Sequence, residues 1–417
     1  PRKELCNYYA PWPVYALDWS KQPREQTFRL AVGSFLEQYN NKLQIIQYRG
    51  NSTAAGDNRP GEGAFPPPPG GDYAGPNHMA EDPQGTGTPR NLDFAVVAEA
   101  DHPYPITKTQ WAPYARGGPA GPDLIATAGD FLRLWEVQPS SQAGPGLQLK
   151  ATLTNSKVDF CAPLTSFDWN ELDLSRLVTC SIDTTCTLWD VHTQQPKTQL
   201  IAHDKEVYDV AFRTGSTDVF ASAGADGSIR MFDLRDLEHS TIIYETPSSV
   251  PTAVPGAPGA AVGANPNALK VSPPLMRLAF NKQDPNFIAT FGMDAASVQI
   301  LDIRMPGIPV YELRGHRGSV NTLAWAPHQA HQLCTAGDDQ QVLVWDIMPA
   351  GGDPSSSGGG LGSARPPGHH PDLSKSIISS PALTYTAPVE VNTVAWSRVV
   401  TEWVAIGFGQ TVQTLRV

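Results

Sequence analysis

The sequence predicts an all-β protein folded as a ring of seven antiparallel blades, a seven-bladed β-propeller. Three observations predict this fold class. A unit of about 40 residues recurs along the chain, each unit is a set of short apolar runs separated by Gly, Asp and Ser turns, and several units end on a Trp-Asp pair. Short alternating or continuous apolar runs bounded by such turn residues are typical of strands, not helices. A small meander of this kind needs neighbours to cover its apolar faces.

The clearest unit runs from His203 to Leu234. It opens on a His, continues as two apolar runs, turns at the Asp of Gly-Ala-Asp-Gly and closes on Met-Phe-Asp-Leu. The unit from His316 to Ile347 repeats this pattern nearly position for position. In both units the opening His precedes the turn Asp by 23 residues. Such agreement along two separate stretches indicates that the same local structure is built twice.

The other units are fainter and follow the same order of runs and turns. They cover residues 14–46, 102–137, 162–191, 275–303 and 389–417. In the unit that ends at residue 137, Thr127 and Trp135 are eight positions apart where other units have ten, so its turn is expected to be tighter. The last unit stops after its third strand. We therefore expect the segment around Leu5–Tyr9 to supply the fourth strand and close the ring.

Four insertions rich in Gly and Pro accompany the units, at about residues 50–92, 138–147, 246–274 and 348–381. Such segments cannot bury enough apolar surface to offset the entropy of ordering them, so they are predicted to be disordered. The alternative for Phe65-Pro-Pro-Pro-Pro69 is a ligand for an aromatic-lined groove. Because no insertion cuts an expected strand, residues 1–417 are predicted to form a single propeller.

Composition restricts the function. The 417 residues carry a formal net charge of −11 and no Lys/Arg-rich run, so direct binding to nucleic acid is not expected. No apolar run approaches the roughly 18 residues that span a bilayer. The five Cys residues include no Cys-x-x-Cys pair and fall mostly beside strand patterns, where a buried free thiol is the expected state. A reducing compartment, cytosol or nucleus, follows.

Polar residues recur at matching places in three units. They are His203, Ser222 and Asp226; His316, Thr335, Asp339 and Trp345; and Thr179, Asp183 and Trp189. A catalytic constellation occurs once, in a cleft, whereas a set that recurs in unit after unit is architecture. We expect a buried network in which the turn Asp accepts from the His ring, the His binds Ser or Thr, and Ser or Thr binds the indole N–H. Phe232 has no indole N–H, so its network is expected to be incomplete.

No sequence pattern indicates chemistry. There is no phosphate-binding Gly loop, zinc-protease motif or nucleophile elbow. His369-His370 stands too isolated to indicate a metal site. We therefore expect no catalytic residues, no metal and no cofactor, and a rigid ring that binds other proteins.

Two levels of family resemblance support this interpretation. The unit endings TLWDV (187–191), VLVWDI (342–347), FLRLWEV (131–137) and MFDL (231–234) resemble WD-repeat propellers. Longer strings, among them RLAVGSFLEQYNNKLQ (29–44), CSIDTTCTLWD (180–190) and QLIAHDKEVYDVAF (199–212), resemble one WD-repeat adaptor family. That family contains the plant transparent testa glabra and light-regulated WD proteins and an animal cullin-associated factor. The resemblance covers all seven units and omits the four insertions.

The resemblance implies a non-catalytic scaffold, a monomeric ring in cytoplasm and nucleus. Its implied partners are DYRK- and HIPK-type kinases and transcription regulators such as bHLH and MYB factors. The alternative that it implies is a substrate receptor of a cullin-RING ubiquitin ligase. Receptors that dock on the damage-binding adaptor of these ligases often carry Asp-x-Arg after the third strand of two consecutive blades. Here the matching positions are Asp233 with Arg235 and Asp302 with Arg304. Such an Arg either reaches a partner or pairs with an Asp of its own blade.

Overall fold

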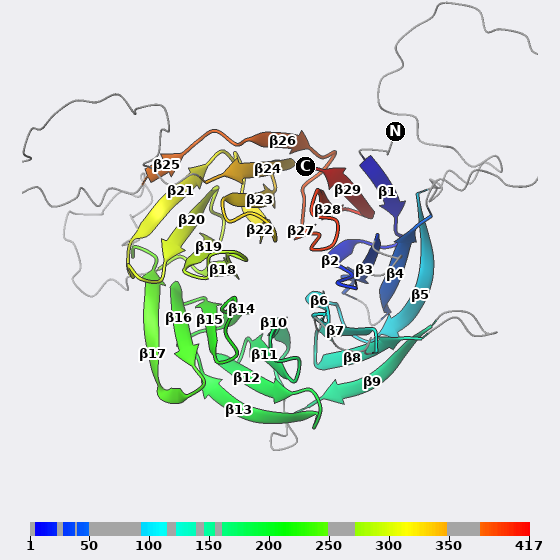
Figure 1. The fold of residues 1–417 in the computed structure, drawn as a ribbon, viewed down its shortest axis with the longest axis horizontal. Coiled ribbons are helices and arrows are strands. Elements are labelled where there is room, and N and C mark those ends of the chain that lie inside the picture. The colour runs from blue at the N-terminus through cyan, green and yellow to red at the C-terminus, as the bar shows by residue number, and fades with distance from the viewer. Residues whose placement is uncertain are drawn as a thin grey trace, which may run out of the picture.

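The computed structural model describes residues 5–22, 28–37, 40–49, 93–114, 122–138, 146–154, 161–248, 272–347 and 376–417. These residues form 29 strands in seven sheets, arranged as blades around a central axis (Figure 1). Six sheets have four strands and one has five. The prediction of an all-β, seven-bladed propeller is confirmed. Within the described ranges no helix is long and apolar enough to cross a membrane.

Blades 1 to 7 are numbered in chain order, and their strands run from the innermost to the outermost (Figure 1). Blade 1 consists of β2 (Val14–Trp19), β3 (Arg29–Ser34), β4 (Asn41–Tyr48) and β5 (Phe94–His102). Blade 2 consists of β6 (Lys108–Trp111), β7 (Leu124–Ala128), β8 (Leu132–Val137) and β9 (Leu147–Leu153). Blade 3 consists of β10 (Leu164–Trp169), β11 (Arg176–Ser181), β12 (Thr185–Asp190) and β13 (Gln195–Ile201). Blade 4 consists of β14 (Val207–Phe212), β15 (Val219–Gly224), β16 (Ser228–Asp233) and β17 (Asp236–Glu245).

The last three blades continue the pattern with two changes in strand order. Blade 5 consists of β18 (Leu275–Phe280), β19 (Phe287–Gly292), β20 (Ser297–Asp302), β21 (Pro309–Arg314) and a fifth strand, β25 (Ser376–Ile378). Blade 6 consists of β22 (Val320–Trp325), β23 (Gln332–Gly337), β24 (Gln341–Asp346) and β26 (Leu383–Thr386). Blade 7 consists of β27 (Thr393–Trp396), β28 (Trp403–Phe408), β29 (Thr411–Arg416) and β1 (Leu5–Tyr9).

Alternation of strand direction divides the turns between two faces of the ring. The turns from first to second and from third to fourth strand lie on one face, which includes Asp233 and Asp302 at the ends of β16 and β20. We call it the Asp-x-Arg face. The turns from second to third strand lie on the opposite face, which includes Asp226 and Asp339. We call it the His face, because His203 and His316 contact those two Asp residues.

The turns on the His face are tight and require positive φ. Thr184, Gly227, Asp294 and Gln340 have φ of 74°, 81°, 57° and 65°. This left-handed region suits Gly and costs most for a β-branched residue such as Thr184. At Gly227 a side chain is excluded as well, since a Cβ would collide with Thr246 and come within 2.8 Å of Ser272. At position 227, Gly is therefore required both by the backbone geometry of the turn and by packing.

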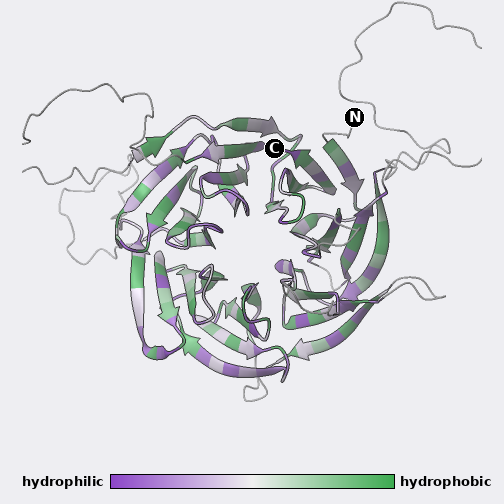
Figure 2. Cartoon of the chain, in the orientation of Figure 1, coloured by the Kyte–Doolittle hydropathy of each residue, from purple (hydrophilic) through white to green (hydrophobic). Residues whose placement is uncertain are grey.

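The core consists of apolar layers between neighbouring blades. One layer joins blades 2 and 3, where Leu134, Phe167 and Trp189 are buried together. Burial of each large apolar side chain stabilises the fold by about 1.5–3 kcal/mol. The outer strand β13 instead carries more hydrophilic residues and is partly exposed along its length (Figure 2). The apolar layers between blades thus hold the ring together, and β13 presents alternate residues to solvent.

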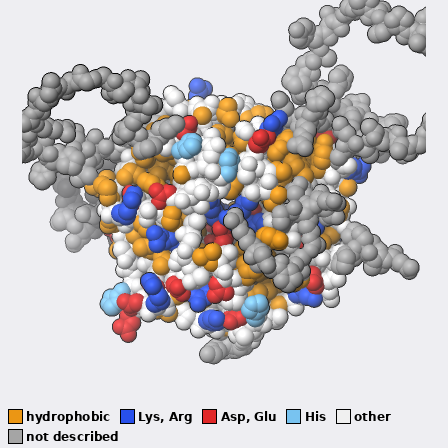
Figure 3. Space-filling view, in the orientation of Figure 1, with side chains coloured by type: hydrophobic (Ala, Val, Ile, Leu, Met, Phe, Trp, Pro, Cys, Tyr) orange, Lys and Arg blue, Asp and Glu red, His pale blue; other side chains and the backbone are white. Residues whose placement is uncertain are grey.

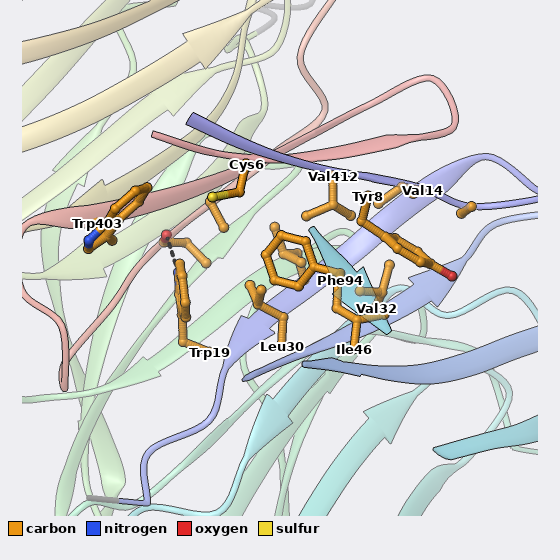
Figure 4. Packing of buried hydrophobic residues seen from close by; sticks show 14 of the residues in the cluster. Cys6, Tyr8, Val14, Trp19, Leu30, Val32, Ile46, Phe94, Trp403 and Val412 are labelled. Atoms are coloured by element: carbon orange, nitrogen blue, oxygen red, sulfur yellow. Dashed lines mark hydrogen bonds between the residues drawn. The ribbon is translucent and has the colours of Figure 1, made fainter. Parts of the chain in front are cut away.

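The N-terminal strand closes the ring, as predicted. β1 pairs antiparallel with β29, from Leu5 opposite Leu415 to Tyr9 opposite Thr411. Figure 4 shows the layer beneath it, where Cys6 and Tyr8 pack among side chains of blades 7 and 1. The indole N–H of Trp19 in blade 1 donates to the carbonyl of Ala395 in blade 7 at 3.0 Å.

Two predicted insertions are shorter than expected. Leu147, assigned to an insertion, is the first residue of β9. Residues 376–378, assigned to another, form β25, which pairs parallel with β21 as the fifth strand of blade 5. The central parts of the four insertions, with the four-proline run and His369-His370, lie outside the described residues.

Candidate binding site

Blade 6 contains the complete predicted network. Nδ1 of His316 is 3.0 Å from a carboxylate oxygen of Asp339, and Nε2 is 2.8 Å from the hydroxyl of Thr335. The indole N–H of Trp345 donates to the same hydroxyl at 2.8 Å. Burial alone would raise the pKa of Asp339, but the N–H of Arg317 and the His316 ring donate to the carboxylate and lower it. The His316 ring, the Thr335 hydroxyl and the Trp345 indole N–H are thus all hydrogen-bonded within the network.

Blade 4 repeats the network without the indole. Nδ1 of His203 is 3.0 Å from Asp226, and Nε2 is 2.7 Å from Ser222. Phe232 lies at the Trp position and stacks on Phe220, with 5.1 Å between ring centroids. The expected lack of an N–H donor at this position is confirmed.

The carboxylate end of the same network is larger than expected. Asp226 also accepts from the backbone and hydroxyl of Ser228, at 3.0 and 2.8 Å, and from Arg230 at 3.1 Å. Burial alone would raise the pKa of Asp226, but the hydrogen bonds from His203 and Ser228 outweigh it and hold the pKa far below its ordinary value. The network of blade 4 therefore lacks an indole N–H at Ser222 and gains the guanidinium of Arg230 at Asp226.

Blade 3 confirms one half of its predicted set and corrects the other. The indole N–H of Trp189 donates to Thr179 at 2.8 Å, inside the core. Asp183 does not join this pair. It is exposed and accepts from the backbone and hydroxyl of Thr185, at 3.1 and 2.7 Å. No described His lies next to it, so the carboxylate stabilises its own turn.

Blade 2 carries a network that was not among the predicted site residues. Nε2 of His102 is 3.1 Å from the hydroxyl of Thr127, which also accepts from the Trp135 indole at 2.9 Å. Burial lowers the pKa of His102 to about 4. Asp130 pairs with Arg133 and leaves the His without a carboxylate partner among the described side chains. The eight-residue spacing to Trp135 was the signal for this variant.

The recurrence of these groups indicates a structural role. The His, Ser/Thr and Trp members of each set are buried, and they donate to and accept from one another. Leaving one member unpaired would cost about 1–3 kcal/mol, which explains why the members occur together. Among the described residues no group of three or more His, Cys, Asp and Glu side chains is arranged to hold a metal ion.

The two Asp-x-Arg turns have the same geometry. Arg235 donates to Asp233 through Nε at 2.8 Å and Nη2 at 2.5 Å. Arg304 donates to Asp302 through the same atoms, at 2.8 and 2.6 Å. The guanidinium of Arg304 also lies 5.7 Å from the centre of the Phe287 ring. Each Arg is therefore paired within its own blade.

Exposure distinguishes the two halves of each turn. The side chains of Arg235 and Arg304 are 72% and 59% exposed, whereas that of Asp302 is 7% exposed. Hydrogen bonds from Arg235 lower the pKa of Asp233 to about 2. The carboxylates thus anchor two guanidinium groups at the same place on neighbouring blades 4 and 5. Their outer N–H edges remain open to a partner on the Asp-x-Arg face.

The inner strands surround a central cavity of about 290 Å³, which the sequence did not reveal. Its wall is held together by side chains that accept a backbone N–H from the next blade. These bonds join Asp18 to Trp111, Gln110 to Trp169, Asp168 to Phe212, Asp209 to Leu278 and Thr322 to Val394, at 2.7 to 3.2 Å. Buried hydrogen bonds between blades restrict their relative motion. The cavity therefore has a rigid wall.

The cavity is lined by charges of both signs, as the side chains at the middle of the ring in Figure 3 illustrate. At the end nearest the Asp-x-Arg face, Glu171 pairs with Lys282 at 3.2 Å and with Arg398 at 2.8 Å. Burial alone would raise the pKa of Glu171, but the charges of Lys282 and Arg398 lower it to about 2. Nearer the His face, Lys108 lies 3.6 Å from Asp209.

Comparison with known proteins gives the same repeat class. The family described as WD domain, G-beta repeat matches residues 194–233 and 307–346. These matches cover the last strands of blades 3 and 5 with the first three strands of the blades that follow.

Three curated proteins are similar over the whole chain. A DDB1- and CUL4-associated factor 7 homolog of Dictyostelium discoideum is 42% identical over 100% of this chain and 99% of its own length. An uncharacterized WD repeat-containing protein of Schizosaccharomyces pombe is 38% identical over 100% of this chain and 90% of its own. A WD repeat-containing protein of Saccharomyces cerevisiae is 34% identical over 99% and 77%.

Proposed function

Because the chain belongs to the WD-repeat family of these full-length relatives, we propose that it is a non-catalytic adaptor that assembles other proteins on its ring. The observation that carries the proposal is the recurrence of the His, Ser/Thr and Trp groups as buried hydrogen-bonded sets in several blades. Groups used in this way are not available as nucleophile or general base. What the ring offers instead is two faces of turns on a rigid frame.

The test is whether the ring bridges partners. Proteins that co-purify with it from native extract are identified by mass, and two of them are then immunoprecipitated from extract depleted of the ring. We expect their association to be lost on depletion and restored by the purified protein. Partners that still associate without the ring would contradict an adaptor role. We propose DYRK- and HIPK-type kinases and bHLH or MYB factors as the classes to look for, in cytoplasm and nucleus.

A second candidate is a substrate receptor of a cullin-RING ligase. It is favoured by the matched Asp-x-Arg turns on blades 4 and 5 and by the similarity to a protein named as DDB1- and CUL4-associated. A guanidinium that is fixed by its own carboxylate and exposed at its outer edge can donate to a carboxylate or carbonyl of a docking partner. In this candidate the Asp-x-Arg face docks on the ligase and the rest of the ring holds the substrate.

The double variant Arg235→Ala with Arg304→Ala tests this candidate. Both side chains are largely exposed, so the melting temperature should change little. Co-purification with DDB1 should be lost while other partners remain bound. Arg314→Ala is a matched control, because Arg314 is also 57% exposed and paired with a carboxylate, Glu312, at 2.9 Å, but near the other face of the ring. Retention of DDB1 by the double variant, or equal loss in the control, would refute docking through these turns.

A further inference from the structure

One cation of the central cavity lacks a carboxylate partner. Arg277 lines the cavity and is half-buried. Its guanidinium donates to the carbonyl of Tyr208 at 3.2 Å, that of Met276 at 3.3 Å and the hydroxyl of Tyr15 at 3.4 Å. All three acceptors are neutral and the contacts are long. No described carboxylate lies within 4.0 Å of its nitrogens, which is the range of every ion pair in the described parts of the chain.

The carboxylates nearby are already engaged. Asp209 accepts from Ser166 at 2.5 Å and from the backbone N–H of Leu278 at 3.0 Å, and Lys108 lies 3.6 Å away. Along the wall five cationic and four acidic side chains face the cavity, although the whole chain carries a net charge of −11. The cations are Lys21, Lys108, Arg277, Lys282 and Arg398, and the acids are Asp18, Asp168, Glu171 and Asp209. The lining therefore carries one more cation than acid, and Arg277 is its cation without an ion pair, although Asp209 lies near enough to attract it.

The mouth near Arg277 opens on the His face. Tyr15, which accepts from Arg277, packs against Phe35 with 4.7 Å between ring centroids. Phe35 follows β3 on the His face and is 40% exposed. A ligand entering here would meet an aromatic edge first and the guanidinium below it. With a volume of about 290 Å³, at the lower end of the range for small-molecule sites, the cavity suits one or two side chains of a protein segment.

We propose that this mouth binds a carboxylate of an acidic segment in a partner protein, with Arg277 as the residue that recognises it. The inference rests on the adaptor function proposed above and names the chemical class of ligand that one of its binding sites takes. A guanidinium can bind a carboxylate through two parallel hydrogen bonds. On binding, Arg277 would exchange long contacts with neutral oxygens for shorter, charge-assisted hydrogen bonds. Because Arg277 faces the His side and Arg235 and Arg304 the other, an acidic segment and a docked ligase can be bound at the same time.

Two labelled peptides test the site. One is Gly-Tyr-Glu-Glu-Glu-Gly with an amidated C-terminus, and the other has Gln in place of each Glu. Fluorescence polarisation with the wild-type protein should give at least about tenfold tighter binding of the Glu peptide. This comparison needs no variant, so it is decisive even if a substitution impairs folding. Equal binding of the two peptides, or no binding of either, would overturn the proposal.

Variants locate the contact. Arg277→Met should remove the preference for Glu over Gln, and Arg277→Lys should keep part of it. Arg398→Met is the matched control, because it removes one cation from the other end of the same cavity and should keep the preference. Equal loss in both would mean that the charge of the cavity acts as a whole, against recognition by Arg277. Inorganic phosphate is the competing anion, and binding of phosphate without a preference for the Glu peptide would also overturn the assignment.

The same variants separate this site from the docking turns. Arg277→Met should retain DDB1 wherever the wild type does, and the double variant of Arg235 and Arg304 should retain the Glu peptide. Loss of DDB1 from both variants would contradict two independent sites. If the wild type binds the Glu peptide but bridges no partners in the depletion experiment, the adaptor function fails while the carboxylate site stands.

Discussion

Substitution of Tyr8 should reveal how much of the stability depends on ring closure. The side chain of Tyr8 is 1% exposed and lies in the layer between blades 7 and 1 (Figure 4). Its hydroxyl donates to Oε1 of Gln44 at 2.5 Å. Truncating a buried aromatic residue to Ala costs about 3–5 kcal/mol, and an acceptor left unsatisfied adds about 1–3 kcal/mol. Tyr8→Ala should therefore lower the free energy of unfolding by about 4–8 kcal/mol.

The assay is denaturant unfolding followed by near-ultraviolet circular dichroism, with thermal melting as a second measure. For a ring of this size, a loss of this magnitude corresponds to a fall of about 5–10 °C in melting temperature. Tyr9→Ala is the control, because Tyr9 is the next residue of β1, points to the opposite side of the strand and is only half-buried. A change below about 1 kcal/mol for Tyr8→Ala, or an equal change for Tyr9→Ala, would refute the view that β1 is an integral strand of blade 7.

Three further predictions concern titrating groups. Burial raises the pKa of Tyr8 to about 12, and the negative charge of Glu99 adds to the effect. The stability that the neutral phenol contributes should therefore be complete below pH 10 and lost between pH 10 and 12. In parallel urea titrations, this alkaline loss of stability should be smaller by about 2–3 kcal/mol in Tyr8→Phe than in the wild type. Since the pKa of Glu171 is about 2, its contribution to the free energy of unfolding should be present above pH 4.5 and lost as the pH falls towards 2. Glu171→Gln should therefore lose less stability than the wild type over this acid range. An unchanged loss would argue against the pair with Arg398. Asp226→Ala should destabilise by on the order of 1–3 kcal/mol and by at least as much as Asp339→Ala, because it also removes one of the two carboxylates that Arg230 contacts, the other being Asp204 at 2.8 Å. A milder effect at Asp226 would show that its contact with the guanidinium contributes little.

The repeats could be predicted from sequence because each blade obeys short-range rules. The positions of His316, Asp339 and Trp345 are fixed by hairpin register, and register follows from turn length and strand alternation. The missing fourth strand of the last unit was likewise visible in the chain. The prediction that β1 supplies this strand followed because a blade needs four strands and the N-terminal segment was not assigned to any other blade.

The outer strands were less predictable because they pair on one side only. β17 is exposed over most of its length, and its residues carry little alternation. β25 gave no local signal at all. It pairs in parallel with β21 of blade 5 after the chain has passed through three strands of blade 6, and a parallel pair has no hairpin turn to mark it in the sequence.

Side-chain partners were predicted only where every member of a set was present. Asp183 was grouped with Thr179 and Trp189 by position, but the pattern had no His to receive its carboxylate. The side chain therefore bonds to Thr185 in its own turn. In blade 4 the reverse occurred. The absence of an indole at Phe232 was predicted correctly, but the compensating Arg230 was not, because its contact with Asp226 depends on the shape of the turn between β15 and β16.

The cavity wall shows how a departure from a repeat can mark a binding residue. Asp209 in blade 4 and Thr322 in blade 6 occupy the same place on their inner strands, and each accepts a backbone N–H from the next blade. Arg277 occupies this place in blade 5, where a donor cannot make that bond, and reaches back to the carbonyl of Tyr208. Blades 5 and 6 are joined instead by the indole N–H of Trp325, which donates to the carbonyl of Ala279 at 3.0 Å. Positions where a sequence departs from the structural rule that its neighbouring repeats follow are expected at functional sites, and Arg277 departs from the rule of the blades on both sides of it.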